Sequence, residues 1–156
     1  MELHYYTLKR QASELSVRFK ETRIEASYTQ KKNELILQVH DRDGDNGHLV
    51  MSTDPQYPFI LSKSTQRRSK LSKDVMKDLV GKKIQGISIL PGDRIIIVDF
   101  IPSHHRLLLQ FFLKRTNFFI VNENYQIQEA FKQNKKFSGQ IYSVPTAVAT
   151  EFTKIS

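Results

Sequence analysis

Four apolar segments that follow one another between residues 84 and 121 constrain the fold more than any other feature of the sequence. Each is rich in β-branched and aromatic residues and ends at a short cluster of Pro, Gly, Asp, Ser or Asn. Such runs are typical of successive antiparallel strands joined by tight turns. Residues 95–98 are Ile, Ile, Ile and Val without interruption, which predicts a strand buried on both faces. The rest of the chain must therefore cover both faces of this sheet.

The turn between the first two segments, residues 84–90 and 94–101, has the sequence Pro91-Gly92-Asp93. Proline presets a turn φ and glycine accepts a positive φ, so these residues predict a tight hairpin. Asp93 and Arg94 then stand side by side at its tip with opposite charges. By themselves, these residues indicate an ordinary turn.

Upstream of this run, the sequence predicts one helix and four strands. Residues 5–20 form an amphipathic helix in this interpretation, because apolar residues recur on one stripe at the helical period: Leu8, Ala12, Leu15 and Phe19. Residues 23–30 and 34–40 alternate between apolar and polar and predict a hairpin. Two further short strands are expected at residues 48–52 and 57–61.

A second helix is predicted at residues 70–80, where Leu71, Val75 and Leu79 share one stripe and Gly81 provides a C-terminal stop. Residues 122–136 are polar with scattered apolar residues, and we expect an irregular segment there. The sum is one α+β domain, an antiparallel β-sandwich of about eight strands flanked by two helices.

The net charge of +8 is concentrated in one part of the chain. Residues 63–83 hold eight basic residues against two aspartates, whereas residues 24–62 are net negative. Such concentration favours a polyanionic partner, nucleic acid first and an acidic membrane surface second. A solvated face that only aids solubility is an equally good interpretation. The candidate contacts to a nucleic-acid backbone are Arg67, Arg68, Lys70, Lys73, Lys77, Lys82 and Lys83.

No catalytic or metal-binding motif is recognisable, so we expect neither enzymatic activity nor a cofactor. The aspartate-rich loop at residues 41–47 fails as a calcium site, because Asn46 and Ser52 stand where Gly and Glu are required. His104 and His105 are adjacent and are expected in a turn before a strand. Asp99 lies within an apolar strand, and we expect it to pair with Arg106 on the neighbouring strand.

The cellular setting follows from what the sequence lacks. The sequence has no cysteine, which fits a reducing compartment. Its amino terminus does not show the basic segment followed by an apolar segment that marks a signal peptide. No apolar run approaches the roughly 20 residues that a membrane helix requires. We therefore expect a soluble cytoplasmic protein that does not enter membranes.

Several segments together resemble the amino-terminal domain of the NFACT proteins, which are ribosome-associated quality-control factors long described as fibronectin-binding-protein-A-like. The matching segments occur in the family's order and cover residues 1–146, leaving residues 147–156 as a tail. They are Tyr28-Thr29-Gln30, Asn33-Glu34-Leu35-Ile36-Leu37, Met76-Lys77-Asp78-Leu79-Val80-Gly81, Gly92-Asp93-Arg94-Ile95, Lys114-Arg115-Thr116-Asn117-Phe118 and Gly139-Gln140-Ile141-Tyr142.

The resemblance implies a fold like the amino-terminal domain of formamidopyrimidine-DNA glycosylase. It also implies a non-catalytic domain that binds tRNA on a large ribosomal subunit with stalled peptidyl-tRNA and promotes tailing of the nascent chain. The family's Asp-Arg pair falls on Asp93 and Arg94, and its Arg-x-Asn motif falls on Arg115 and Asn117. For the last two residues, a structural role as a turn cap is at least as plausible as RNA contact.

The sequence also departs from the family. Leu3-His4-Tyr5 stands where many members have Phe-Asp-Gly, and the further domains of full-length members are absent, so the chain is either a fragment or a stand-alone module. Two alternatives stay open. A DNA glycosylase would need an amino-terminal Pro, yet no Pro precedes Pro55. An adhesin that binds fibronectin or fibrinogen is suggested only by the older family name. The oligomeric state cannot be inferred.

Overall fold

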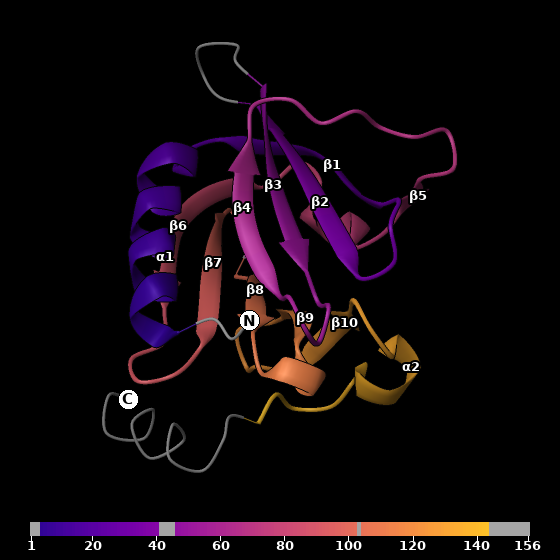
Figure 1. The fold of residues 1–156 in the computed structure, drawn as a ribbon. Coiled ribbons are helices and arrows are strands. Elements are labelled where there is room, and N and C mark those ends of the chain that lie inside the picture. The colour runs from indigo at the N-terminus through magenta and orange to yellow at the C-terminus, as the bar shows by residue number, and fades with distance from the viewer. Residues whose placement is uncertain (1–3, 41–45, 103, 144–156) are drawn as a thin grey trace.

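The computed structural model describes residues 4–40, 46–102 and 104–143, and it is built around one ten-stranded antiparallel sheet (Figure 1). The strand order is β10-β9-β8-β7-β6-β1-β2-β3-β4, with β5 paired to β1 off this path. The strands are β1 (Arg23–Thr29), β2 (Glu34–His40), β3 (Asn46–Ser52), β4 (Phe59–Lys63), β5 (Lys73–Asp74), β6 (Lys83–Ile89), β7 (Ile95–Ile101), β8 (Arg106–Gln110), β9 (Asn117–Val121) and β10 (Ile127–Ala130). The helices are α1 (Tyr5–Phe19) and α2 (Asn134–Phe137), with 3-10 turns η1 (Lys77–Leu79) and η2 (Leu113–Arg115).

The sheet has two halves, β1–β4 and β6–β10, that pack against each other across one main core. That core takes side chains from both, for example Leu37 and Met51 from the first half and Val98 and Leu109 from the second. The α+β class is therefore confirmed. The expected β-sandwich takes the form of one open sheet, because β1 hydrogen-bonds both β2 and the start of β6, so the sheet continues through both halves. Bulges in β1 and β6 add local twist near this junction.

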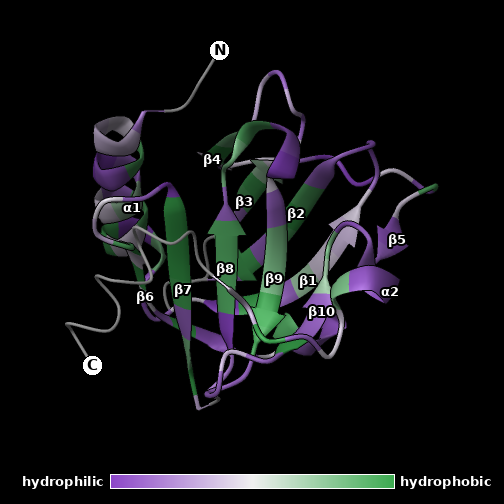
Figure 2. Cartoon of the chain, turned by 90° about the horizontal axis from the view of Figure 1, so that it is seen from below, coloured by the Kyte–Doolittle hydropathy of each residue, from purple (hydrophilic) through white to green (hydrophobic). Residues whose placement is uncertain are grey.

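Strands β7, β8 and β9 are buried on both faces, as their unbroken apolar runs predict (Figure 2). In β9, Phe118 and Ile120 face the main core, whereas Phe119 and Val121 belong to a second cluster on the other face. The second cluster is covered by β10, α2 and Tyr142. Residues 122–136, expected to be irregular, thus supply a strand and a short helix. Their pattern is weak because β10 has only four residues.

Helix α1 packs on β6 through the four residues of its predicted stripe, all of which are buried. Ser16 fixes the contact, since its Oγ accepts a hydrogen bond from the backbone N–H of Ile87 at 3.0 Å. The predicted pair of Asp99 and Arg106 is also confirmed: they lie opposite each other in register, and the Arg106 Nε donates to the Asp99 Oδ1 at 2.7 Å. Of the loop expected at residues 41–47, residues 46 and 47 belong to β3 and the rest lie outside the described residues, as does the expected tail at residues 147–156.

The predicted helix at residues 70–80 is wrong. Leu71 is 88% exposed, Val75 is half-buried and Leu79 is buried, so the three residues of the predicted stripe do not share one packed face. The backbone explains the difference: β5 pairs with β1, and Met76 has a left-handed φ of 51° that interrupts any helix. The apolar spacing that suggested a helix comes from a strand, a kink and a single 3-10 turn in succession.

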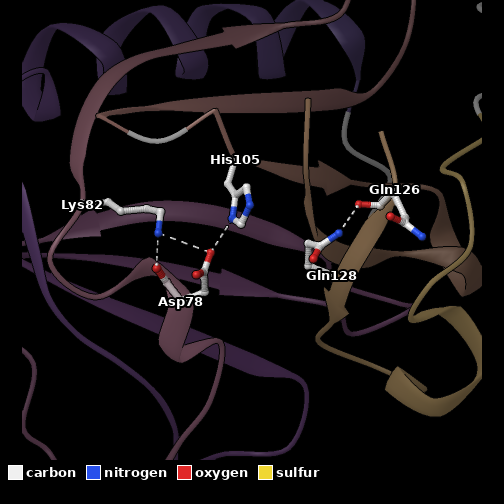
Figure 3. A network of polar contacts seen from close by, with 5 residues as sticks. All are labelled: Asp78, Lys82, His105, Gln126 and Gln128. Carbon is white, nitrogen blue, oxygen red and sulfur yellow. Dashed lines mark hydrogen bonds and ion pairs between the residues drawn. The ribbon is translucent and has the colours of Figure 1, made fainter. Parts of the chain in front are cut away.

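Asp78 ties the η1 turn to the beginning of β8 (Figure 3). Its Oδ2 lies 2.7 Å from the Nδ1 of His105 and 3.3 Å from the Nζ of Lys82, and the Lys82 ammonium also donates to the Asp78 backbone carbonyl at 2.6 Å. Burial alone would raise the pKa of Asp78. The hydrogen bond from His105 and the charge of Lys82 outweigh burial, so the pKa lies below its ordinary 3.8.

Two leucine substitutions separate the observed segment from the predicted helix. Leu79→Ala should lower the free energy of unfolding by about 2–5 kcal/mol, because a fully buried side chain leaves a cavity. Leu71→Ala should change it by less than about 0.5 kcal/mol, since that side chain is in solvent. Urea denaturation of both variants measures the difference. If both variants lost several kcal/mol of unfolding free energy, the result would support the predicted helix, in which Leu71 and Leu79 share one buried face.

The Asp78 contacts predict an acid-dependent loss of stability. Because its folded-state pKa is depressed, the stabilisation is fully present above the ordinary value and is lost as pH falls through the folded-state pKa. The free energy of unfolding should therefore fall more steeply below about pH 4 in the wild-type chain than in Asp78→Asn. Denaturation at several pH values tests this, and parallel curves below pH 4 would show that the pairing contributes nothing.

Candidate nucleic-acid interface

The turn between β6 and β7 holds Asp93 and Arg94 in a well-defined conformation. Gly92 supplies the left-handed φ of 81° that the turn requires. The Asp93 N–H donates to the Leu90 carbonyl at 3.2 Å, and the Arg94 N–H donates to the Asp93 Oδ1 at 2.7 Å. The Arg94 carbonyl accepts from Phe111 at 3.0 Å. Both side chains are half-buried, so the hairpin tip is neither hidden nor loose.

Asp93 and Arg94 line a groove of about 610 Å³, here called the tip groove. η2 adds Lys114 and Arg115 to its lining, so three cationic residues line the groove with one carboxylate. The remaining lining residues are Pro55, Gln56, Phe112 and Leu113. An opening with this balance of charge suits an anionic ligand.

A second and larger depression of about 850 Å³, here called the basic pocket, adjoins the tip groove. The two share Pro55, Phe112, Lys114 and Arg115. Five cationic side chains line the basic pocket: Lys32, Lys114, Arg115, Lys132 and Lys136. Of its described lining residues, none carries a carboxylate. The structure therefore brings the predicted residues 93, 94, 115 and 117 to one continuous surface.

Gln110 and Tyr142 form hydrogen bonds that fix the backbone at Arg115, a residue that lines both depressions. The Gln110 Nε2 donates to the Arg115 carbonyl at 2.7 Å, and the Tyr142 hydroxyl donates to the Gln110 Oε1 at 2.7 Å. Burial raises the pKa of Tyr142, and the charge of Asp93 raises it further, so the phenol stays protonated and remains a donor. These bonds hold the η2 backbone at a fixed position beside the hairpin tip.

Asn117 has a structural role. It is 5% exposed, and its Nδ2 donates to the Lys132 carbonyl at 2.9 Å. Its Oδ1 accepts from the backbone N–H groups of Phe118 at 2.8 Å and Lys132 at 2.9 Å. The side chain thus fixes the backbone of Lys132 at the wall of the basic pocket. Arg115, in contrast, is exposed and lines both depressions, with its Cζ 5.6 Å from the centre of the Phe112 ring.

The basic segment at residues 63–83 lies elsewhere. None of its residues lines either depression, and β5 lies on the opposite side of the molecule from the β6–β7 hairpin (Figures 1 and 2). Arg68 is engaged, with its Nη2 2.6 Å from the Asp74 Oδ1 and its Cζ 4.3 Å from the centre of the Tyr28 ring. Lys82 is paired with Asp78. The exposed cations of this segment are Lys63, Arg67, Arg68, Lys70, Lys73, Lys77 and Lys83.

Sequence reasoning missed four cations of this surface: Lys32, Lys114, Lys132 and Lys136. Their signal is faint because they come from three separate parts of the chain (the β1–β2 turn, η2 and residues 132–136) rather than from one run of charge. Among the described residues, no helix is long and apolar enough to cross a membrane, and no group of three or more acidic or histidine side chains could hold a metal ion.

The role assigned to Asn117 can be tested by its removal. Asn117→Ala should lower the free energy of unfolding by about 1–3 kcal/mol, because backbone groups of Lys132 and Phe118 lose their partners. Asn124→Ala, at an exposed position, is the control and should be nearly neutral. Thermal and urea denaturation provide the measurement. Unchanged stability with weakened RNA binding would instead make Asn117 a direct RNA contact.

Comparison with known proteins agrees with this architecture. The model of the family NFACT N-terminal and middle domains matches residues 5–146. The N-terminal domain of fibronectin-binding protein PavA from Streptococcus pneumoniae superposes with a TM-score of 0.76 at 19% identity, covering 96% of this chain and 68% of that one. The fibrinogen binding protein from Staphylococcus aureus superposes with a TM-score of 0.71 at 21% identity, covering 88% of this chain.

These identities establish a shared fold alone, and the chain spans 55% of the length of the Staphylococcus aureus protein. No curated protein matches the sequence. The likeness to the glycosylase domain stays a prediction. Because the family model covers residues 5–146, the chain belongs to the NFACT N-terminal and middle domains family, as its sequence motifs predict.

Proposed function

We propose that this chain is a non-catalytic, tRNA-binding domain of a cytoplasmic ribosome quality-control factor that acts on large ribosomal subunits with stalled peptidyl-tRNA. Family membership supports a role in ribosome quality control. The observation that carries the finer proposal is the tip groove, which Arg94, Lys114 and Arg115 line together. In this proposal the groove receives the sugar-phosphate chain of the tRNA.

The chemistry of the tip groove suits a phosphodiester. A guanidinium can donate two parallel hydrogen bonds to phosphate oxygens, and two such groups face the groove with one lysine. Asp93 uses one carboxylate oxygen to hold its own turn. Its other oxygen is suited to accept a hydrogen bond from a ribose 2′-hydroxyl, which would favour RNA over DNA.

The exposed cations of residues 63–83 have a separate part in this proposal. None of them lines either depression, and β5 lies across the molecule from the β6–β7 hairpin (Figures 1 and 2). We assign Arg67, Lys70, Lys73, Lys77 and Lys83 to backbone contacts with a second stretch of nucleic acid. Arg68 and Lys82 should contribute less, since each is already paired with an aspartate.

A second candidate comes from the names of the two similar structures, which describe binding to fibronectin and fibrinogen. Binding of this chain to either protein would be the corresponding alternative. The charge distribution favours RNA, whose affinity should decline steeply with salt as counterions are released. Glycosylase activity, the third hypothesis, would appear as cleavage at an abasic site in DNA.

Charge reversal at the hairpin tip tests the leading proposal. Arg94→Glu should weaken tRNA binding about tenfold or more and reduce the dependence of log K on log salt by about one. Fluorescence anisotropy with labelled tRNA at several salt concentrations, with the circular dichroism spectrum as a check on folding, measures both effects.

Lys135→Glu is the control, because Lys135 is exposed on α2 and lines neither depression. The control should bind within about twofold of wild type, since a surface charge away from the site acts only through a screened field. Equal affinities of Arg94→Glu and wild type would remove the tip groove from the proposal. Tight binding of fibronectin or fibrinogen without binding of tRNA would favour the second candidate.

A further inference from the structure

The basic pocket collects positive charge from three parts of the chain that are distant in sequence. Lys32 comes from the turn between β1 and β2, Lys114 and Arg115 come from η2, and Lys132 and Lys136 come from the end of β10 and from α2. Neither Asp93 nor any other described carboxylate lines the pocket. Folding therefore brings five cations to one concavity without a described negative charge among them.

This arrangement has an electrostatic cost that a bound anion would offset. Lys132 is half-buried, and both its burial and the nearby charge of Lys32 lower its pKa. Solvated lysines on a convex surface would avoid each other, because their long side chains can extend into water. Here the half-buried Lys132 has less of that freedom. An anion of two or three oxygens would relieve the repulsion and accept several donors at once.

A buried hydroxyl provides an independent observation. Thr116 lines the basic pocket and is 5% exposed, and its Oγ1 has no hydrogen-bond partner within the described part of the chain. A buried hydroxyl without a partner is costly, and such groups are uncommon in folded proteins. The Oγ1 is closed off from solvent as the side chain stands, so a ligand in the pocket would satisfy it after a rotation of the Thr116 side chain, since a hydroxyl can donate to an anionic oxygen.

The pocket is also held in shape before any ligand binds. Asn117 fixes both backbone groups of Lys132, and Gln110 fixes the carbonyl of Arg115. The Gln140 Nε2 donates to the carbonyl of Lys136 at 2.6 Å. Each of these side chains orders the backbone of one cation. A site that is ordered in advance loses less conformational entropy when it binds.

We propose that the basic pocket is a phosphate-binding subsite, in which Arg115, Lys132 and Lys136 neutralise a phosphate group and the Thr116 hydroxyl donates to one of its oxygens. The subsite is distinct from the hairpin tip and extends the surface that faces the ligand. The inference deepens the proposed function and rests on it for the source of the phosphate, which is an RNA backbone. A free nucleotide has the same chemistry and is the other source to distinguish.

The test uses the full chain with three probes: inorganic phosphate, adenosine 5′-monophosphate, and a short single-stranded RNA. Isothermal titration calorimetry compares wild type with Lys132→Gln and Thr116→Val. Each variant should bind the preferred probe about five- to tenfold more weakly, since each loses a charge-assisted donor. Tighter binding of the RNA oligonucleotide identifies an RNA backbone as the source of the phosphate. If adenosine 5′-monophosphate saturates the pocket at the same concentration, the source is a free nucleotide.

Two further variants separate recognition from folding. Thr116→Ser keeps the hydroxyl and should bind within about twofold of wild type, whereas a purely structural role would make Ser and Val differ only in stability. Lys135→Gln removes a neighbouring charge that does not line the pocket and should also bind within about twofold. Unchanged affinity of both Lys132→Gln and Thr116→Val would overturn the subsite.

The outcomes for the subsite and for the proposed function are distinguishable. If tRNA binding depends on Arg94 but not on Lys132 or Thr116, the subsite is wrong and the proposed function stands. If phosphate or nucleotide binding depends on Lys132 and Thr116 while tRNA does not bind, the subsite stands and the proposed function is wrong. If wild type binds none of the three probes, the subsite is overturned.

Discussion

The structure depends on the short stretch of backbone where β1 meets the start of β6. Four hydrogen bonds join residues 21–24 to residues 81–84: Glu21 N–H to Ile84 O at 2.7 Å, Ile24 N–H to Lys82 O at 2.9 Å, Gly81 N–H to Ile24 O at 2.8 Å and Ile84 N–H to Thr22 O at 2.9 Å. These bonds make one sheet out of two halves. The common apolar core then holds the halves face to face, since burying its side chains is the main favourable term in folding.

The charged surface follows from that geometry. The lining of the basic pocket includes Asn33, Thr53 and Pro55 from the first half of the chain and residues of η2 and β9 from the second. Neither half contains the depression by itself. The apolar core therefore does more than stabilise the fold, because it brings cations that are distant in sequence to one depression. The repulsion that results is modest beside the burial of the core and can be retained at a binding surface.

Local patterns in the sequence predicted local structure well. Helix α1, the β1–β2 hairpin and the strands from β6 to β9 follow from periodicity and turn residues, and the Asp99–Arg106 pair follows from strand register. Prediction failed where long-range pairing decided the outcome. Residues 70–80 had a helical stripe, but β1 offers β5 a strand partner. That the predicted sandwich is one continuous sheet could not be foreseen, because continuity at the β1–β6 junction is not visible in any one segment.

The candidate surface was predictable only in part. The turn with Asp93 and Arg94 could be located from its sequence, and the structure places both residues beside Arg115. The basic run at residues 63–83 drew attention because its charges are adjacent in sequence, although they lie away from either depression. Lys32, Lys132 and Lys136 are adjacent only in space. Asn117 resembled a ligand contact, yet a 5% exposed amide with three backbone bonds supports its neighbour.

Because residues from both halves of the sheet line the basic pocket, a ligand bound there would contact both halves at once. A ligand that touches Lys32 on one side and Lys132 on the other could be held only while the sheet junction is intact. Occupancy and folding are then thermodynamically linked, and a saturating ligand raises the free energy of unfolding by RT ln(1 + [L]/Kd). Separating the chain between β4 and β6 would abolish the cavity even if each half kept its strands.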